Sequence, residues 1–263
     1  MKWQTVETKK GTRCRVLEGG SGTALIFLHG AGGLLGDNPF LDQLARSHHV
    51  FAPEWPGYGA DGGEEKLEDM LDFALHGWDV VDALGLDAEV RLAGHSMGGM
   101  IAAEMACIAN RSLAKLALIA PAGLWLDAHP IPDLFSMLPF ELVGALFADP
   151  KNGEKFLTGG IDFGNPEALQ QFLVTNARRL GTAGKILFPI PNRRLAKRLY
   201  RLVAPTLVVW GSADKLIPLP YAERWRQLVP HARLSIVDGG SHMVPYEQTE
   251  PVAVEIERFL STA

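Results

Sequence analysis

The sequence predicts an α/β fold, in which a mostly parallel sheet is covered by helices on both faces. Short continuous apolar runs, typical of strands buried on both sides, alternate along the chain with segments whose apolar residues recur at helical spacing. This alternation stops between about residues 122 and 203 and then resumes. The interrupted rhythm indicates one α/β core with an inserted segment.

The expected elements follow one another in a regular order. Two short strands, at 2–8 and 12–18, surround a Lys-Gly turn and should pair antiparallel. Further strands are expected at 24–28, 50–53, 89–94, 116–120, 205–210 and 233–237. Helices are expected at 38–46, 67–84, 97–110, 220–229 and 251–260. The sheet is therefore predicted to be built from both ends of the chain.

The interrupting segment is helical in pattern and rich in leucine, aromatic residues and proline. It is too long for a loop within a compact domain and too apolar for a linker. We therefore expect a core formed by residues 1–122 and 203–263, with a helical lid at 123–202 inserted between the two parts.

Composition excludes several classes of function. A formal net charge of −5 argues against nucleic acid as a partner, because phosphate binding needs a basic face. The start of the chain has no apolar signal segment, and no run of roughly twenty apolar residues could cross a membrane. The two cysteines, Cys14 and Cys107, show no disulfide or zinc pattern, which fits a reducing cytoplasm. We expect a cytoplasmic protein with a small-molecule partner, whose oligomeric state, monomer or homodimer, stays open.

The most informative motif is Gly94-His95-Ser96-Met97-Gly98, which lies where an apolar strand gives way to a helix. Glycine on either side allows strand, turn and helix to approach closely, while the serine is held in a strained backbone at the carboxyl end of the sheet. The first N–H groups of the helix lie beneath it. Ser96 is therefore the candidate nucleophile, the alternative being an ordinary strand-to-helix turn.

A serine nucleophile needs a base, and the base needs an acid that fixes its tautomer. His242 lies in a glycine-rich loop after the last strand, at the same edge of the sheet as Ser96. Asp214 follows the penultimate strand and lies between nucleophile and base in chain order. Asp238 and Asp127 are alternative acids, although Asp238 is better placed to cap a turn.

Attack on a carbonyl produces an oxyanion, which needs hydrogen-bond donors aimed at it in advance. The N–H of Met97, next after the nucleophile, is one candidate. The second is the N–H of Ala31, in the loop after the strand at 24–28, and Gly32 is the alternative.

The same loop has a superficial likeness to a dinucleotide-binding fingerprint. That pattern would need a third glycine where Leu35 stands, and the chain has neither a phosphate-binding loop of the Gly-Lys-Ser/Thr type nor a metal-ligand spacing. We therefore expect no cofactor and no metal.

These motifs together resemble the α/β-hydrolase superfamily over most of the chain outside the insertion. The residues that carry the resemblance are His29-Gly30, Trp55-Pro56-Gly57-Tyr58-Gly59, Gly94-His95-Ser96-Met97-Gly98-Gly99, Trp210-Gly211-Ser212-Ala213-Asp214 and Gly240-Ser241-His242. The resemblance implies an eight-stranded sheet, a Ser96–Asp214–His242 triad and a lid over the pocket. We expect the substrate to contact His29 and Gly30 in the core and Trp125 and Phe135 in the insertion.

Two departures narrow the resemblance. Ser96 stands where epoxide hydrolases and haloalkane dehalogenases carry an aspartate nucleophile. The carbon–carbon bond hydrolases of aromatic degradation have a longer Gly-Pro motif after the first His-Gly and a tryptophan after the catalytic histidine, where this chain has Met243. The expected activity is hydrolysis of a mainly apolar carboxylic ester, thioester or lactone. Carbon–carbon bond hydrolysis, ligand sensing with slow turnover, and an interaction protein with a relic site are the alternatives.

Overall fold

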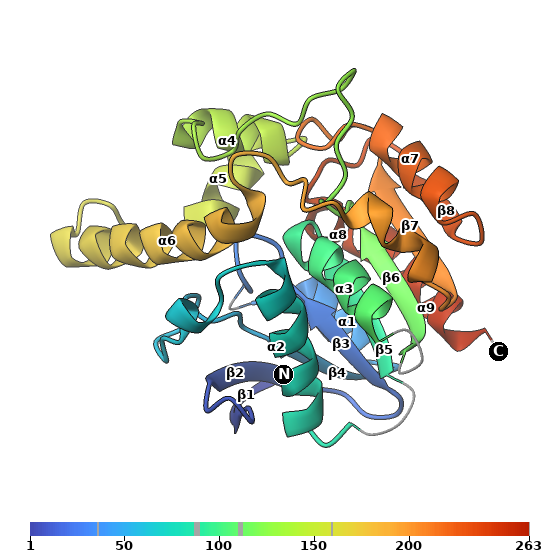
Figure 1. The fold of residues 1–263 in the computed structure, drawn as a ribbon. Coiled ribbons are helices and arrows are strands. Elements are labelled where there is room, and N and C mark those ends of the chain that lie inside the picture. The colour runs from blue at the N-terminus through green and yellow to red at the C-terminus, as the bar shows by residue number, and fades with distance from the viewer. Residues whose placement is uncertain (36, 87–89, 110–112, 159, 263) are drawn as a thin grey trace.

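The apolar runs form one sheet of eight strands in the computed structural model, which describes residues 1–35, 37–86, 90–109, 113–158 and 160–262 (Figure 1). The strands are β1 (Lys2–Glu7), β2 (Arg13–Gly19), β3 (Ala24–Leu28), β4 (His49–Pro53), β5 (Val90–His95), β6 (Leu113–Ile119), β7 (Thr206–Gly211) and β8 (Arg233–Val237). Their order across the sheet is β1-β2-β4-β3-β5-β6-β7-β8. The β1–β2 and β2–β4 pairs are antiparallel and the other pairs are parallel. The predicted mostly parallel sheet is confirmed.

Helices cover both faces of this sheet. The helices outside the insertion are α1 (Pro39–Leu44), α2 (Met70–Ala83), α3 (Met97–Ile108), α7 (Pro220–Leu228), α8 (Val244–Glu247) and α9 (Thr249–Ser261), with a short 3-10 turn η1 (Glu64–Lys66). α2, α3 and α7 belong to one buried apolar cluster, and α1, α8 and α9 belong to another. In Figure 1, α2 and α3 lie in front of the sheet, and α1 and α9 lie behind it.

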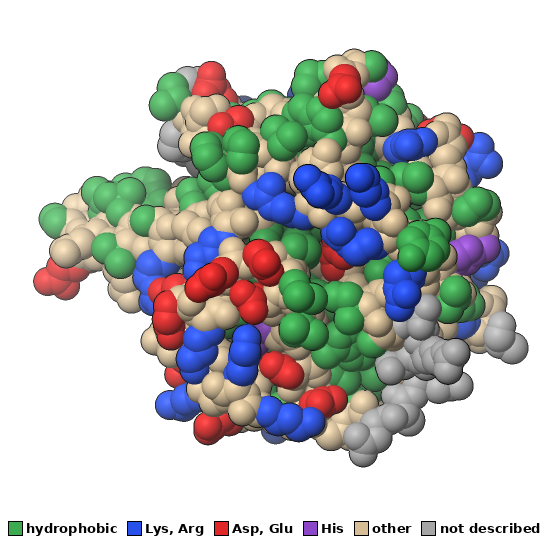
Figure 2. Space-filling view, viewed as in Figure 1, with side chains coloured by type: hydrophobic (Ala, Val, Ile, Leu, Met, Phe, Trp, Pro, Cys, Tyr) green, Lys and Arg blue, Asp and Glu red, His purple; other side chains and the backbone are tan. Residues whose placement is uncertain are grey.

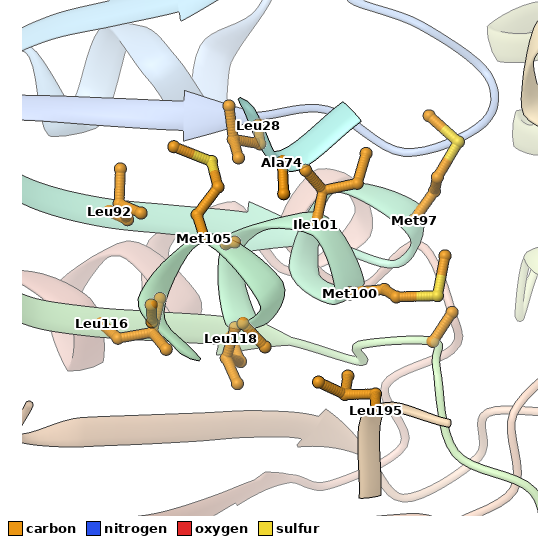
Figure 3. Packing of buried hydrophobic residues seen from close by; sticks show 14 of the residues in the cluster. Leu28, Ala74, Leu92, Met97, Met100, Ile101, Met105, Leu116, Leu118 and Leu195 are labelled. Atoms are coloured by element: carbon orange, nitrogen blue, oxygen red, sulfur yellow. The ribbon is translucent and has the colours of Figure 1, made fainter. Parts of the chain in front are cut away.

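Alternation along the central strands supplies both clusters. In β3, Ile26 and Leu28 point to the cluster with α3, whereas Leu25 and Phe27 point to the opposite one. Figure 3 shows the first cluster, in which methionine and isoleucine side chains of α3 pack over leucines of β3, β5 and β6. This packing fixes the N-terminus of α3 against the ends of the parallel strands.

The segment between β6 and β7 is largely helical. It contains α4 (Pro139–Leu146), α5 (Pro150–Thr158), α6 (Pro166–Leu187) and two 3-10 turns, η2 (Leu195–Lys197) and η3 (Leu199–Arg201). α6 extends well beyond the rest of the molecule (Figure 1, yellow). Buried Ala183, Ile186 and Leu187 anchor its C-terminal end, whereas Leu173 and Val174 farther out are exposed. The helical character expected for this segment is therefore found.

Most predicted elements lie within a few residues of the observed ones. The helix expected from residue 67 begins at Met70, because the Asp69 side chain caps it by accepting hydrogen bonds from the N–H groups of Leu71 and Asp72. Residues 89 and 110, which the predicted strand and helix included, lie outside the described residues. The short helix α8 was not predicted. Among the described helices, none combines the length and apolarity needed to cross a bilayer.

Gly98 provides a test of how tightly α3 approaches the sheet. A Cβ at this position would lie 2.0 Å from the carbonyl oxygen of Leu28, which is backbone and cannot move aside. We expect Gly98→Ala to lower the free energy of unfolding by about 3 kcal/mol or more, measured by denaturant titration. The matched control is Gly181→Ala in α6, where a Cβ meets nothing within 4 Å. That change should raise stability by up to about 1 kcal/mol, and equal effects of both changes would contradict the close approach.

Candidate active site

Ser96 occupies a strained turn between β5 and α3. Its φ is 54° and its ψ is −116°, in a region that residues other than glycine rarely adopt. The surrounding backbone holds this conformation, because the Ser96 N–H donates to the Ile119 carbonyl at 2.9 Å. The Ser96 carbonyl in turn accepts from the N–H groups of Met100 at 3.1 Å and Ala122 at 3.0 Å. The serine is therefore fixed from three sides.

The structure brings Ser96, His242 and Asp214 together, although they are far apart in the sequence. His242 Nε2 lies 2.9 Å from Ser96 Oγ, and His242 Nδ1 lies 2.8 Å from Asp214 Oδ2. The other carboxylate oxygen of Asp214 accepts from the N–H groups of Leu216 and Ile217 at 2.9 and 2.8 Å. With Asp214 accepting at Nδ1, the network assigns the Nδ1–H tautomer, which leaves Nε2 to accept from the serine hydroxyl.

The two alternative acids have other partners. Asp238 Oδ1 accepts from the Ser212 hydroxyl at 3.1 Å, at the turn after β8. Asp127 Oδ1 accepts from the indole N–H of Trp125 at 2.9 Å. Neither carboxylate contacts His242 within the described part of the chain, so the geometry favours Asp214 as its partner.

His95 supports the loop that carries His242. Burial lowers the pKa of His95 to about 3, so the ring is neutral. Its Nε2 donates to the backbone carbonyl of His242 at 2.9 Å, and the two rings are 5.2 Å apart. The residue before the nucleophile thus positions the backbone of the base.

The two backbone N–H groups predicted as oxyanion donors belong to Met97 and Ala31. Met97 is the first residue of α3 and Ala31 lies in the loop after β3, and neither N–H donates a hydrogen bond to any of the described residues. The Tyr58 hydroxyl donates to the Ala31 carbonyl at 3.0 Å and lies 4.0 Å from Met97 Sδ. Tyr58 therefore touches both sides of this candidate oxyanion hole, a role that sequence reasoning missed.

His29 holds the same loop and does not line the cavity beside Ser96, so the contact with substrate expected from the sequence is not found there. Burial lowers its pKa to about 4. Its Nε2 accepts from the Trp55 N–H at 3.2 Å, and its Nδ1 donates to the Gly30 carbonyl at 2.7 Å. His29 is fully buried and bridges two loops of the core.

A cavity of about 500 Å³ opens beside Ser96 and His242. The loop after β3, including Gly30, forms part of its wall, and residues of α4, α5 and α6 form much of the rest. Phe135 lines a separate small cavity that also reaches Ser96. Trp125 lines neither cavity, because its indole is engaged by Asp127, so its expected contact with substrate is not found.

Glu247 connects the insertion to the loop of His242. Its carboxylate accepts from the N–H groups of Ala148 and Asp149, at the junction of α4 and α5, and from the Ser241 hydroxyl. The Met243 N–H also donates to the Leu146 carbonyl at 3.1 Å. These bonds link the cavity wall to the residues on either side of the base, and no sequence motif marks Glu247.

Comparison with known proteins identifies the family of the chain. The sequence matches the family model described as "Alpha/beta hydrolase family" over residues 25–255. The chain belongs to this family. Membership in this family agrees with the fold described above.

The proteins similar to this chain are named for different activities. The chain is 30% identical to the dihydrolipoyllysine-residue acetyltransferase component of the acetoin cleaving system of Pseudomonas putida, over 93% of this chain but only 65% of that protein. It is 26% identical to 2-hydroxy-6-oxo-6-(2'-aminophenyl)hexa-2,4-dienoic acid hydrolase of Metapseudomonas resinovorans, over 95% of this chain and 88% of the relative. A bacterial membrane phospholipase A structure matches with a TM-score of 0.77 and 23% identity, covering 98% and 85% of the two chains. That last likeness concerns the fold.

The buried neutral histidines predict how stability changes with pH. His29 and His95 have folded pKa values of about 4 and about 3, below the ordinary 6.5, so the unfolded chain binds more protons below that pH. The free energy of unfolding should therefore be highest above pH 6.5 and fall as the pH drops toward 4. Each histidine contributes a slope approaching about 1.4 kcal/mol per pH unit in that window.

Denaturant titrations between pH 7.5 and 4.5 measure this dependence. His95→Gln removes one titrating ring. The free energy of unfolding of this variant should therefore change less steeply with pH, by the contribution of one histidine. An unchanged slope in the variant would show that His95 binds as many protons in the folded protein as in the unfolded chain over this pH range, which would contradict its lowered pKa.

Proposed function

We propose that this α/β hydrolase is a serine hydrolase that cleaves a mainly apolar carboxylic ester, or a related thioester or lactone, through an acyl-enzyme on Ser96. One observation carries the proposal: the continuous hydrogen-bond chain from Ser96 Oγ through the His242 ring to Asp214. A hydroxyl needs such a base to become a nucleophile at neutral pH.

The proposed reaction has two halves. His242 Nε2 takes the hydroxyl proton as Ser96 Oγ attacks the carbonyl carbon, and then gives that proton to the departing alcohol. Water next attacks the acyl-enzyme, with His242 again accepting and returning a proton, which releases the acid and the free serine. Asp214 holds the ring in position and stabilises its charged form in both halves.

The proposed oxyanion hole consists of the N–H groups of Met97 and Ala31. Both groups are held in position before the reaction begins. Met97 is held by the start of α3, and Ala31 by the loop that His29 and Tyr58 support. A donor of this kind lowers the barrier by roughly 3–4 kcal/mol. The protein supplies nucleophile, base and donors itself, so the proposal requires no cofactor.

The insertion at 123–202 is proposed to act as a lid. Its helices α4, α5 and α6 supply leucine and phenylalanine side chains to the cavity wall, which favours an apolar substrate part. Gly30 and Phe135 are the predicted substrate contacts that line the two cavities. The expectations of a cytoplasmic location and a small-molecule partner go with this proposal.

Ser96→Ala tests the assignment of the nucleophile. We expect turnover of short-chain p-nitrophenyl esters to fall by several orders of magnitude while circular dichroism and the melting temperature stay near those of the wild type. Near-normal turnover would overturn the proposal. In the wild type, a stoichiometric burst of nitrophenol without further turnover would instead favour a ligand sensor, and no release at all would favour a relic site.

Tyr58→Phe tests the support of the candidate oxyanion hole. The variant keeps the buried ring but loses the hydrogen bond to the Ala31 carbonyl. We expect kcat for p-nitrophenyl butanoate to fall about fivefold, the equivalent of about 1 kcal/mol, with KM little changed. A change in KM alone would mean that Tyr58 acts on substrate binding and not on the oxyanion donors.

Carbon–carbon bond hydrolysis is the second candidate, favoured by the relative named as a dienoic acid hydrolase. Against it, Met243 stands where such enzymes carry tryptophan. The two candidates are separated by comparing two substrates. One is the dienoic acid that the relative's name gives, whose hydrolysis is followed as a loss of its absorbance, and the other is a p-nitrophenyl ester. A higher kcat/KM for the dienoic acid would favour this candidate over ester hydrolysis.

A further inference from the structure

The main cavity has walls of different chemistry. α4, α5 and the turn after α5 contribute an apolar wall, formed by Leu142, Leu146, Phe156, Leu157 and Ile161. α6 contributes the apolar Phe172 and Leu180 and also a polar strip, in which Gln171, Thr175 and Arg179 recur at a spacing of four residues. Among the described residues lining the cavity, Arg179 is the one with a permanent charge.

Arg179 has no partner within the described part of the chain. Its Nε is buried and makes no hydrogen bond, and no carboxylate lies within ion-pair distance of its guanidinium. Its neighbour in α6, Arg178, has a carboxylate partner. Arg178 Nε and Nη2 both donate to Glu64 Oε1, at 3.0 and 2.8 Å. A guanidinium next to it without such an acceptor bears a desolvation cost that no hydrogen bond from the described residues offsets.

The guanidinium of Arg179 lies against the loop that carries the candidate oxyanion donor. A Cβ on Gly33, which has a φ of +89°, would lie 3.7 Å from Arg179 Nε. The Glu54 carboxylate lies in electrostatic range of Arg179 and has an ion pair with Arg15 at 3.5 Å. Arg179 thus lines the cavity close to the loop of Ala31 and makes no hydrogen bond with any of the described residues.

We propose that Arg179 binds a carboxylate of the substrate, so that the preferred substrates are esters with an apolar body and one free carboxylate. A guanidinium forms two parallel hydrogen bonds with a carboxylate, which fixes the position of the carboxylate as well as its charge. In this arrangement the carbon chain of the substrate packs against the apolar wall. Its carboxylate lies at Arg179, at one end of the polar strip of α6. This inference rests on the proposed ester hydrolysis, whose nucleophile and base lie in the same cavity.

Matched pairs of aryl esters test this specificity. On the acyl side, the p-nitrophenyl monoesters of glutaric, adipic and suberic acid are compared with the same esters whose free carboxylate is capped as a methyl ester. On the alcohol side, 4-carboxyphenyl butanoate is compared with its methyl-capped form. We expect kcat/KM of the anionic member to exceed that of the neutral one by about 10- to 100-fold in one of these series, mainly through KM. The series that shows it identifies the part of the ester that bears the carboxylate.

Arg179→Met should reduce this ratio to near one, and Arg179→Lys should keep part of it, because lysine retains the charge without the paired donors. The matched control is Arg178→Met, which removes the adjacent arginine and should leave the ratio unchanged. Wild-type ratios near one in both series would overturn the inference, as would equal losses of both ester members in Arg179→Met. Hydrolysis of neutral esters that depends on Ser96 would still support the proposed function in either case.

Two readouts do not depend on turnover. Calorimetry of Ser96→Ala with monomethyl adipate should show binding at least tenfold tighter than with dimethyl adipate, and the difference should vanish when Arg179→Met is added. Thermal unfolding should show Arg179→Met at least as stable as the wild type, since an unpaired charge is removed, whereas Arg178→Met loses the Glu64 pair and melts lower. A strong loss of stability in Arg179→Met, with no difference in calorimetry, would show that Arg179 is a structural residue.

Discussion

The structure depends on the close approach of β5, the turn at Ser96 and α3. Gly94 is needed there because a Cβ would lie 2.5 Å from the Gly98 carbonyl oxygen. This packing forces Ser96 to a φ of 54°, and the hydrogen bonds of its N–H and carbonyl prevent relaxation. The packing of the buried apolar cluster around α3 offsets the cost of this strained backbone, which holds the Ser96 hydroxyl at the edge of the sheet.

Residues from distant parts of the chain converge at that edge because parallel strands end there together. β3, β5 and β7 lead into the loops of Ala31, Ser96 and Asp214, and β8 leads into the loop of His242. Each loop is then fixed by a buried partner, as His29 fixes the loop after β3 and His95 fixes the His242 carbonyl. Neutral buried rings suit this task because burial keeps their pKa values near 3 to 4, well below neutral pH.

Most of the core could be predicted because its signals are local. Continuous apolar runs mark the parallel strands, and the glycines around Ser96 mark the turn whose position in the fold then limits where a base and an acid can lie. Tertiary contacts could not be predicted in this way. Trp125 and His29 look like cavity residues in the sequence, but Asp127 engages one and the backbone at Gly30 and Trp55 engages the other.

The insertion was harder to predict for the same physical reason. Its helical pattern shows that helices form, but not which side of each helix meets the core. Glu247, five residues beyond the candidate base, joins the α4–α5 junction through acceptor contacts that no local pattern encodes. In Figure 2, the projecting part of α6 carries hydrophobic side chains next to polar surface, so hydrophobicity alone does not show which α6 residues face the cavity.

The adjacent arginines of α6 show how much depends on direction. Successive residues of a helix point about 100° apart, so Arg178 turns toward η1 while Arg179 turns toward the cavity. The contact of α6 with the core is already secured by the Arg178–Glu64 pair and by Lys185 Nζ, which donates to the Leu67 carbonyl at 2.8 Å. Holding the helix therefore does not require a charge at position 179. A cation kept without an acceptor, in a wall that could have been apolar, is best explained by an anion that arrives with the substrate.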